Sequence, residues 1–259
     1  MAVFVGQKRL LRELNLIEIE ILSGKNFNII LPAPSGWGKT TLAYKIINDT
    51  VGLNGANLSV PPDFCINTKK RINFIDEAHL LTEPEPLYPY LDWGGSTFII
   101  ATNELSGLKE PVINRCIPLI FEPYTMDDMI ELVEISMQRF KLPKELSTDI
   151  AEKSKLNPRI AKQLCQRLDY VFSNYGVPSN IEMLDYLVEE VLGVSKDGLN
   201  SMDRRYLDFL RTSGGRASIT LISNMLRIDR DTLLRDVEPH LIHLGYIKIT
   251  SRGREMVRE

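Results

Sequence analysis

The feature that most constrains this 259-residue chain is an apolar run, a glycine-rich loop and a helix-forming stretch in direct succession. The apolar run, residues 27–31, has the composition of a buried parallel strand. The loop and the first residues after it are Ala33, Pro34, Ser35, Gly36, Trp37, Gly38, Lys39, Thr40 and Thr41. Glycines there let backbone N–H groups face phosphate oxygens, and the helix N-terminus adds the positive end of its dipole. This order predicts a phosphate-binding loop in a parallel α/β fold.

The side chains that follow the loop suit a nucleoside triphosphate with its metal. We expect Lys39 to reach the β- and γ-phosphates of ATP and Thr40 to hold Mg²⁺. Such loops have a glycine at their first position, where this chain has Ala33. Alanine adopts negative φ angles readily, so we expect the loop to keep its shape. The alternative is a simple Gly/Pro turn that ends in an exposed lysine.

Two further apolar runs end in residues that can act on a bound nucleotide. Residues 72–75 are followed by Asp76 and Glu77, and residues 97–101 lead to Asn103. Parallel strands present their ligand at their carboxyl ends. We therefore expect Asp76 to hold Mg²⁺, Glu77 to polarise the attacking water, and Asn103 to sense the γ-phosphate. An ordinary turn at the strand end is the alternative for Asn103.

The four residues 76–79 also spell the signature of a large class of helicases. That class needs two tandem motor domains, and a chain of 259 residues is too short for both. We therefore interpret His79 as a packing or local hydrogen-bonding residue.

Composition excludes several classes of protein. Hydrophobic residues make up 44% and charged residues 25%, as in an ordinary globular protein. No apolar stretch approaches the roughly 18 residues of a membrane span, and the N-terminus lacks a signal-peptide pattern. The three cysteines, Cys65, Cys116 and Cys165, are scattered, which argues against a disulfide framework or a CxxC metal site. We expect a cytoplasmic protein with no membrane partner.

The pattern of apolar residues divides the chain into three predicted domains. Residues 1–122 alternate strands with helices, as in a parallel sheet domain. Residues 123–195 read as a small all-helical domain. Residues 196–259 combine three helices with a β-like pair, which is typical of a winged helix. The helices we expect cover 7–23, 39–48, 127–140, 144–155, 158–173, 180–191, 201–212, 218–225 and 229–243.

Charge is distributed unevenly along the chain. The net charge is −3 overall, but residues 196–259 carry +3 and the remainder −6. A basic C-terminal domain hints at nucleic acid. The candidate DNA contacts are Arg227 and Arg230 near the third predicted helix and Arg252 and Arg254 in the predicted wing. We expect them to bind backbone phosphates, so affinity would fall steeply with salt. A winged helix that binds protein, or only packs, is the alternative.

Taken together, these motifs resemble the AAA+ ATPases, and within them the RuvB family of Holliday-junction motors. The resemblance covers almost the whole chain. The Walker motifs alone specify only an NTPase, whereas the C-terminal segments are specific to the family. The segments that carry the resemblance are 4–7, 38–43, 75–79, 229–232, 237–242, 244–247 and 252–254.

The resemblance implies an ATPase that assembles as a homo-oligomeric ring, a hexamer, and acts on duplex or branched DNA. It places Val5 in a nucleotide-binding linker. It assigns Arg115 as the arginine finger that reaches the ATP of the neighbouring subunit, and Arg159 as the sensor 2 residue of the helical lid. The catalytic set is then Glu77, Asn103, Arg115 and Arg159.

One departure from the family bears on the partner. Members of the family carry a β-hairpin between the Asp-Glu strand and the Asn-ended strand, and this hairpin docks RuvA. Here residues 80–97 fill that interval and leave no room for a long hairpin. A loader of the clamp-loader or helicase-loader type, which remodels a partner protein on DNA during replication, is therefore the alternative function. A DNA-binding regulator with a vestigial loop is a third reading, supported only by Ala33.

Overall fold

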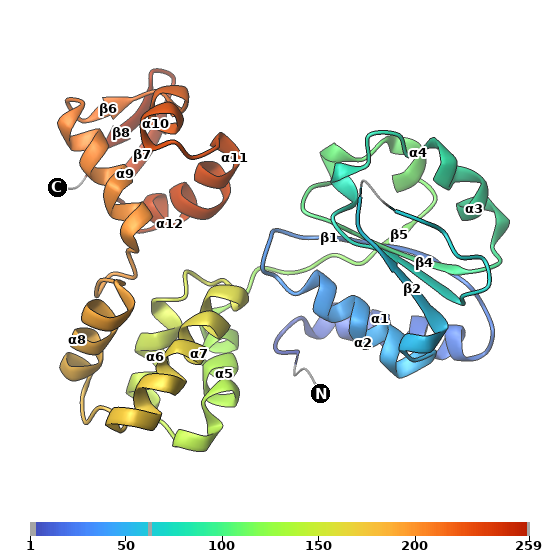
Figure 1. Ribbon diagram of the computed structural model, residues 1–259, viewed down its shortest axis with the longest axis horizontal. Coiled ribbons are helices and arrows are strands. Elements are labelled where there is room, and N and C mark those ends of the chain that lie inside the picture. Colours follow the sequence, from blue (N-terminus) through green and yellow to red (C-terminus); the bar gives the residue numbers. More distant parts are fainter. Residues whose placement is uncertain (1–3, 62–63, 258–259) are drawn as a thin grey trace. The chain divides into compact units, whose positions relative to one another are not determined.

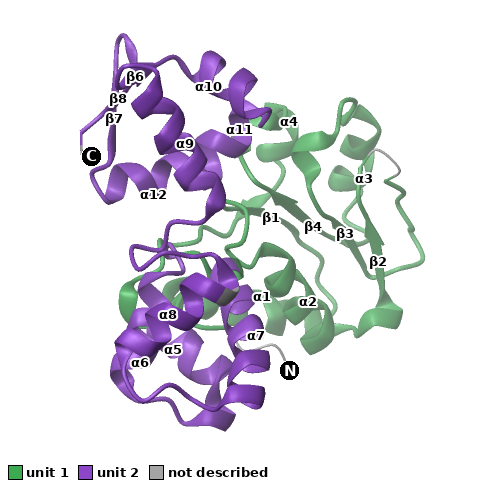
Figure 2. Cartoon of the chain, turned by 60° about the vertical axis from the view of Figure 1, so that its left-hand side comes forward, with its two compact units in different colours: residues 1–129, 157–159 green, residues 130–156, 160–259 purple. Residues whose placement is uncertain are grey.

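The computed structural model describes residues 4–61 and 64–257. The chain forms two compact units, coloured separately in Figure 2. The first unit is Met1–Met129 with Asn157–Arg159, and the second is Ile130–Leu156 with Ile160–Glu259. The second unit thus contains most of the predicted helical lid and the whole of the predicted winged helix. The three-domain division stays a prediction.

A parallel sheet of five strands forms the centre of the first unit (Figure 1). Its strand order is β2-β3-β4-β1-β5. The strands are β1 (Asn28–Pro32), β2 (Ala56–Ser59), β3 (Ile72–Ile75), β4 (Thr97–Thr102) and β5 (Ile117–Pro118). β1 pairs with β4 and β5, and β3 pairs with β2 and β4. The predicted strands β1, β3 and β4 are confirmed.

Helices cover both faces of this sheet, and alternate strand residues face each side. Ile29 and Leu31 of β1 belong to the apolar cluster that contains the buried residues of α1 (Lys8–Leu22) and α2 (Lys39–Thr50). Ile30 belongs instead to the cluster that contains Leu91 of α3 (Tyr88–Trp93) and Val112 of α4 (Glu110–Ile113). Both faces are therefore dry, which explains why the strands read as continuous apolar runs.

The interval between β3 and β4 holds no strand. Its elements are η2 (Ala78–Leu80), η3 (Glu85–Leu87) and α3, and residues 76–96 are all described. Leu87 and Leu91 are buried in the sheet's second apolar cluster. The expectation that this interval has no long β-hairpin is confirmed.

Four helices open the second half of the chain. They are α5 (Met126–Ser136), α6 (Lys144–Glu152), α7 (Pro158–Tyr175) and α8 (Ile181–Leu192), followed by a winged helix. The winged helix contains α9 (Ser201–Thr212), α10 (Ile219–Leu226) and a sheet of order β6-β8-β7. Its strands are β6 (Arg216–Ala217), β7 (Ile247–Thr250) and β8 (Gly253–Met256). Tyr206, Leu210, Ile222 and Leu233 are fully buried in its apolar core.

The third helix of the winged helix differs from the expectation in one detail. The predicted helix 229–243 is α11 (Arg230–Thr232), a π-helical stretch (Leu233–Val237) and α12 (Glu238–His243). Pro239 lies in the first turn of α12. Proline has no N–H for the carbonyl four residues earlier and crowds that carbonyl, so the wider π turn accommodates it.

A buried ion pair joins the lid and the winged helix inside the second unit. The Nζ of Lys155, just after α6, pairs with Asp203 in the first turn of α9; their side chains are 7% and 0% exposed. Within the lid, the Nζ of Lys153 lies 2.6 Å from Asp149 of α6 and 2.8 Å from Asp185 of α8. A charge pair thus joins the lid to the winged helix, and a second set of charge pairs joins two helices of the lid.

No helix in the described part of the chain is both long and apolar enough to cross a membrane.

Candidate functional site

The loop after β1 has the backbone that a phosphate requires. Gly36 and Gly38 have φ angles of 86° and 97°, in the left-handed region that favours glycine. A Cβ on Gly36 would meet the Asn157 Oδ1 at 2.4 Å, and one on Gly38 would meet the Phe4 ring at 3.1 Å. Ala33 is not among the described residues with positive φ, so alanine is accommodated at that position without strain.

Lys39 is the first residue of α2, and its side chain turns back over the loop. Its side chain and backbone together are only 5% exposed. Its Nζ donates to the carbonyl oxygens of Ala33 at 2.7 Å and Pro34 at 3.1 Å, and to the Oδ1 of Asn103 at 2.8 Å. A cation is thus held at the mouth of the loop, where the terminal phosphates of a nucleotide would lie.

Thr40, in the first turn of α2, meets Asp76, which directly follows β3. The Thr40 hydroxyl donates to the Asp76 Oδ2 at 2.8 Å. Hydroxyl, carboxylate and phosphate oxygens are the hard ligands that Mg²⁺ prefers, and Mg²⁺ keeps several waters. The two side chains therefore fit a magnesium ion bound together with the nucleotide.

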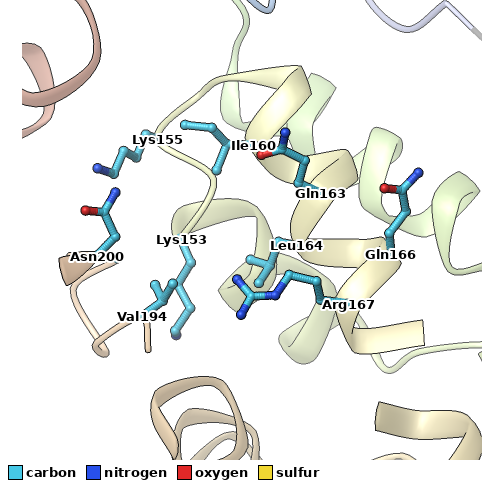
Figure 3. A pocket seen from close by; sticks show the side chains of 10 residues that line it. Lys153, Lys155, Ile160, Gln163, Leu164, Gln166, Arg167, Val194 and Asn200 are labelled. Carbon is cyan, nitrogen blue, oxygen red and sulfur yellow. The ribbon is translucent and has the colours of Figure 1, made fainter. Parts of the chain in front are cut away.

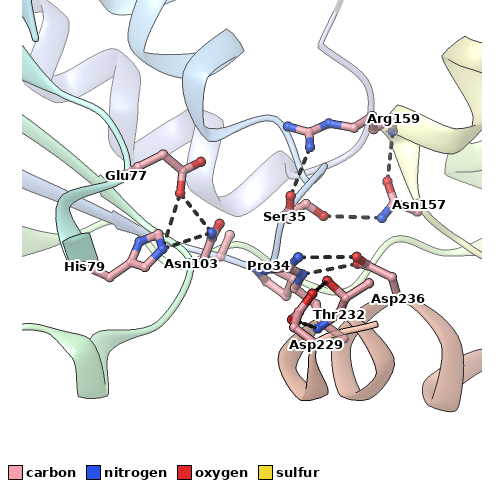
Figure 4. Close-up of polar contacts among 12 residues, drawn as sticks. Pro34, Ser35, Glu77, His79, Asn103, Asn157, Arg159, Asp229, Thr232 and Asp236 are labelled. Carbon is pink, nitrogen blue, oxygen red and sulfur yellow. Dashed lines mark hydrogen bonds and ion pairs between the residues drawn. The ribbon is translucent and has the colours of Figure 1, made fainter. Parts of the chain in front are cut away.

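Glu77, Asn103 and His79 form a cluster beside the loop (Figure 4). Glu77 has a left-handed backbone, with φ 50° and ψ 41°. The Asn103 Nδ2 donates to the Glu77 Oε2 at 2.9 Å. The His79 Nε2 lies 3.5 Å from both of these atoms. The local polar contacts expected of His79 are thus with two residues of the candidate site.

Arg159 lies against the loop, although 124 positions of sequence separate it from Ser35. Its Nη1 donates to the Ser35 Oγ at 3.0 Å. Asn157 supports it, because its Nδ2 donates to the Ser35 carbonyl at 3.3 Å and its Oδ1 accepts from the Arg159 N–H at 2.9 Å (Figure 4). Asn157 was not identified as a site residue from the sequence. Its only sequence signal is its position directly before the proline that begins α7.

The loop is also held from the side of Trp37. The Tyr124 hydroxyl donates to the Trp37 carbonyl at 3.0 Å, and the two rings meet edge to face at 5.8 Å. Burial raises the pKa of Tyr124 to about 12, so the hydroxyl remains a donor. Val5, near the N-terminus, is buried, and its role in binding the nucleotide stays a prediction. The sequence carried no signal for Tyr124.

Arg115 is the one predicted catalytic residue whose contacts lie elsewhere among the described residues. Its Nε donates to the Asp92 Oδ1 at 2.8 Å and its Nη2 to the Asp92 Oδ2 at 3.1 Å. Its Nη1 donates to the Pro111 carbonyl at 2.9 Å, and its guanidinium lies 5.4 Å from the centre of the Tyr88 ring. The hydrogen bond to Asp92 raises its pKa. Its role as a finger stays a prediction.

The four arginines assigned to DNA differ in their surroundings. Arg227, Arg230 and Arg252 are exposed. The Arg254 side chain is only 13% exposed and forms a two-pronged pair with Glu238, at 2.9 and 3.1 Å. This hydrogen bond raises the pKa of Arg254. All four DNA assignments stay predictions, and for Arg254 the guanidinium already serves the core of the winged helix.

A hollow of about 350 Å³ lies where the lid meets the winged helix (Figure 3). Lys153, Lys155, Gln163, Arg167 and Asn200 line it together with apolar side chains. Its two lysines are paired with the aspartates described above, so the hollow offers less positive charge than its lining residues imply.

Comparison with known proteins identifies the family of the chain. The chain is 30% identical to the Holliday junction branch migration complex subunit RuvB of a Wolbachia strain from Drosophila simulans, over 97% of the chain and 88% of that protein. It is also 30% identical to the RuvB subunit of Mycoplasma genitalium, over 97% of the chain and 92% of that protein. The chain belongs to the RuvB family.

Two further comparisons agree with RuvB membership. Residues 196–259 match the model of the RuvB C-terminal winged helix domain, so the winged helix predicted there is confirmed. The Thermotoga maritima RuvB Holliday junction branch migration motor has the same fold, with a TM-score of 0.83 and 25% identity over 98% of this chain and 92% of that one. The predicted AAA+ α/β architecture is confirmed. An intact loop with Lys39 in a RuvB-family chain supports a nucleotide-binding ATPase.

Proposed function

We propose that this chain is an ATP-hydrolysing, ring-forming motor that acts on duplex or branched DNA, as in Holliday junction branch migration. The observation that carries the proposal is the chain of hydrogen bonds from Lys39 through Asn103 to Glu77. It joins the group that would bind the terminal phosphate to the group that would activate water.

Each residue of the site has a distinct task in hydrolysis. The backbone amides of residues 35–41 and the side chain of Lys39 hold the phosphates, and Glu77 orients and polarises the attacking water. Mg²⁺, held by Thr40 and Asp76, would neutralise charge that develops on the phosphate oxygens. Asn103 contacts Lys39 and Glu77, and Arg159 contacts Ser35 of the loop, which supports a response of both residues to the γ-phosphate. Positioning of the reactants and neutralisation of charge, rather than covalent chemistry, then provide the catalysis.

An oligomer follows from the location of Arg115. Its three partners belong to the surroundings of α3 and α4, so a finger on Arg115 would serve another subunit. A closed ring, for which we propose a hexamer, gives every site such a neighbour.

The C-terminal domain supplies the DNA contact in this proposal. Arg227, Arg230 and Arg252 are exposed and suited to backbone phosphates. We propose that the domains 1–122, 123–195 and 196–259 are ATPase, lid and DNA-binding domain. ATP hydrolysis would then shift the lid relative to the ATPase domain and so move DNA held by the C-terminal domain.

The partner protein is the point at which a second function competes. RuvA docking is attributed to a hairpin that residues 76–96 lack. This favours a motor that works without RuvA, or a loader that remodels a replication or recombination protein on DNA.

The deciding experiment measures ATP turnover alone and with single-stranded, duplex and four-way-junction DNA, at low and physiological salt. Strong stimulation by duplex or junction DNA is expected, and it should weaken as salt rises. A Lys39→Ala variant controls for contaminating ATPase. Turnover indifferent to every DNA would reject the self-sufficient motor in favour of the loader.

A further inference from the structure

Arg115 is held on its own subunit by a carboxylate. Asp92 accepts from both Nε and Nη2 of the guanidinium, at 2.8 and 3.1 Å. The Pro111 carbonyl accepts from Nη1 at 2.9 Å, and the Tyr88 ring lies against the guanidinium. Both terminal nitrogens of the side chain are therefore engaged.

The backbone beneath this pair is fixed from the sheet. The Asn28 side chain in β1 donates to the Leu91 carbonyl at 2.9 Å and to the Arg115 carbonyl at 3.0 Å. Leu91 is buried in the apolar cluster on that face. One amide thus ties the residue before Asp92 to Arg115, which sets the two side chains at pairing distance.

The chemistry of the pair opposes that of a finger. A finger works by donating its N–H groups, with their charge, to phosphate oxygens of the transition state. The Asp92 carboxylate is an anionic competitor for the same groups. The two side chains are 33% and 57% exposed, so the pair is of the weak, easily broken kind.

We propose that Asp92 is a positioning residue that holds Arg115 on its own subunit in a parked position. The guanidinium leaves Asp92 when the γ-phosphate of ATP bound to a neighbouring subunit takes the place of the carboxylate. This proposal rests on the proposed function, in which Arg115 is the finger. The segment between β3 and β4, which has no hairpin, thereby gains a regulatory role through α3.

Removing the carboxylate should therefore speed hydrolysis. We expect Asp92→Asn and Asp92→Ala to raise kcat about 2- to 5-fold, the size expected from the loss of one exposed ion pair. The KM for ATP should not change, since the residues that bind ATP lie in a different set of contacts. A merely structural role would lower kcat or disturb KM.

The control is a matched ion pair on the same segment. Glu85 pairs with Lys109, both are exposed, and neither contacts Arg115 in the described structure. Glu85→Gln should leave kcat and KM at wild-type values. ATP turnover of all variants is compared at protein concentrations where the assembled fraction, measured by light scattering, is the same.

The double variant separates the two hypotheses. Arg115→Ala should abolish most turnover, and Asp92→Asn added to it should change nothing further. If Arg115→Ala hydrolyses normally, the finger in the proposed function is wrong. If Arg115→Ala is inactive but Asp92→Asn and Asp92→Ala fail to raise kcat, only the parking role is wrong.

Discussion

At the scale of single residues, one carboxamide connects the two halves of the site. The Asn103 Oδ1 accepts from Lys39 while its Nδ2 donates to Glu77. A carboxamide offers a donor and an acceptor in one side chain, which an aspartate at this position could not do at neutral pH. A phosphate that draws Lys39 away from Asn103 would thus change the hydrogen bond between Asn103 and Glu77.

The test at this scale is Glu77→Gln. Glutamine keeps the shape and the hydrogen bond from Asn103 but removes the base, so we expect ATP to bind normally and hydrolysis to fall about 100-fold or more. Nucleotide affinity from calorimetry and steady-state turnover are measured side by side. Glu13→Gln, on the exposed face of α1, is the control. Near-normal turnover would remove Glu77 from the role of base.

At the scale of elements, the junction between α6 and α9 is built on a buried charge pair. Lys155 pairs with Asp203, which also accepts from the backbone N–H of Asn200 as part of the capping box of α9. Lys155 and Leu156 both have left-handed φ angles, of 58° and 51°. Two such residues in succession are costly, so the contacts around them must hold the backbone in place.

Lys155→Met should therefore destabilise the second unit. It leaves the buried Asp203 carboxylate without its cation, for which we expect a loss of about 3 kcal/mol in the free energy of unfolding. Far-UV circular dichroism in urea follows the helices. Fluorescence of Trp37 and Trp93, which both belong to the first unit, should not shift.

Lys144→Met, at the exposed start of α6, serves as the control for the same chemical change. A loss below 1 kcal/mol for Lys155→Met would mean that this pair does not hold the junction. Restoration of stability in Lys155→Met with Asp203→Asn would identify the stranded charge as the cause.

At the scale of the whole molecule, the proposed function leaves the catalytic site incomplete in a single chain. The described contacts of Arg115 include no residue of the phosphate loop. In the proposed function, a finger on Arg115 must then complete the site of another copy, so that hydrolysis depends on assembly.

Mixing two inactive variants tests this dependence. Arg115→Ala retains its own nucleotide site, and Lys39→Ala retains its finger; each alone should lose about 10³-fold or more in turnover. An equal mixture should recover up to about a quarter of the wild-type rate per chain, because random assembly in a ring pairs an intact site with an intact finger that often. Absence of recovery in assemblies shown to contain both variants would contradict a finger that acts between subunits.

The sequence by itself determined the elements whose signals are local. The loop of Gly36, Gly38 and Lys39 and the acids Asp76 and Glu77 follow short apolar runs, and strand-end position alone predicted their meeting. The winged helix could be predicted in the same way, because the helical periodicity of its apolar residues is visible within residues 196–259 alone.

Only the tertiary structure decided the parts that depend on distant neighbours. β2 is short and partly polar, and β5 has only two residues, one of them a proline. They become strands because β3 and β1 offer them hydrogen bonds. Asn157, Tyr124 and Asp92 acquire their roles from partners that lie 23 to 122 residues away in sequence. Local periodicity carries no record of such contacts, since they arise when packing brings remote segments together.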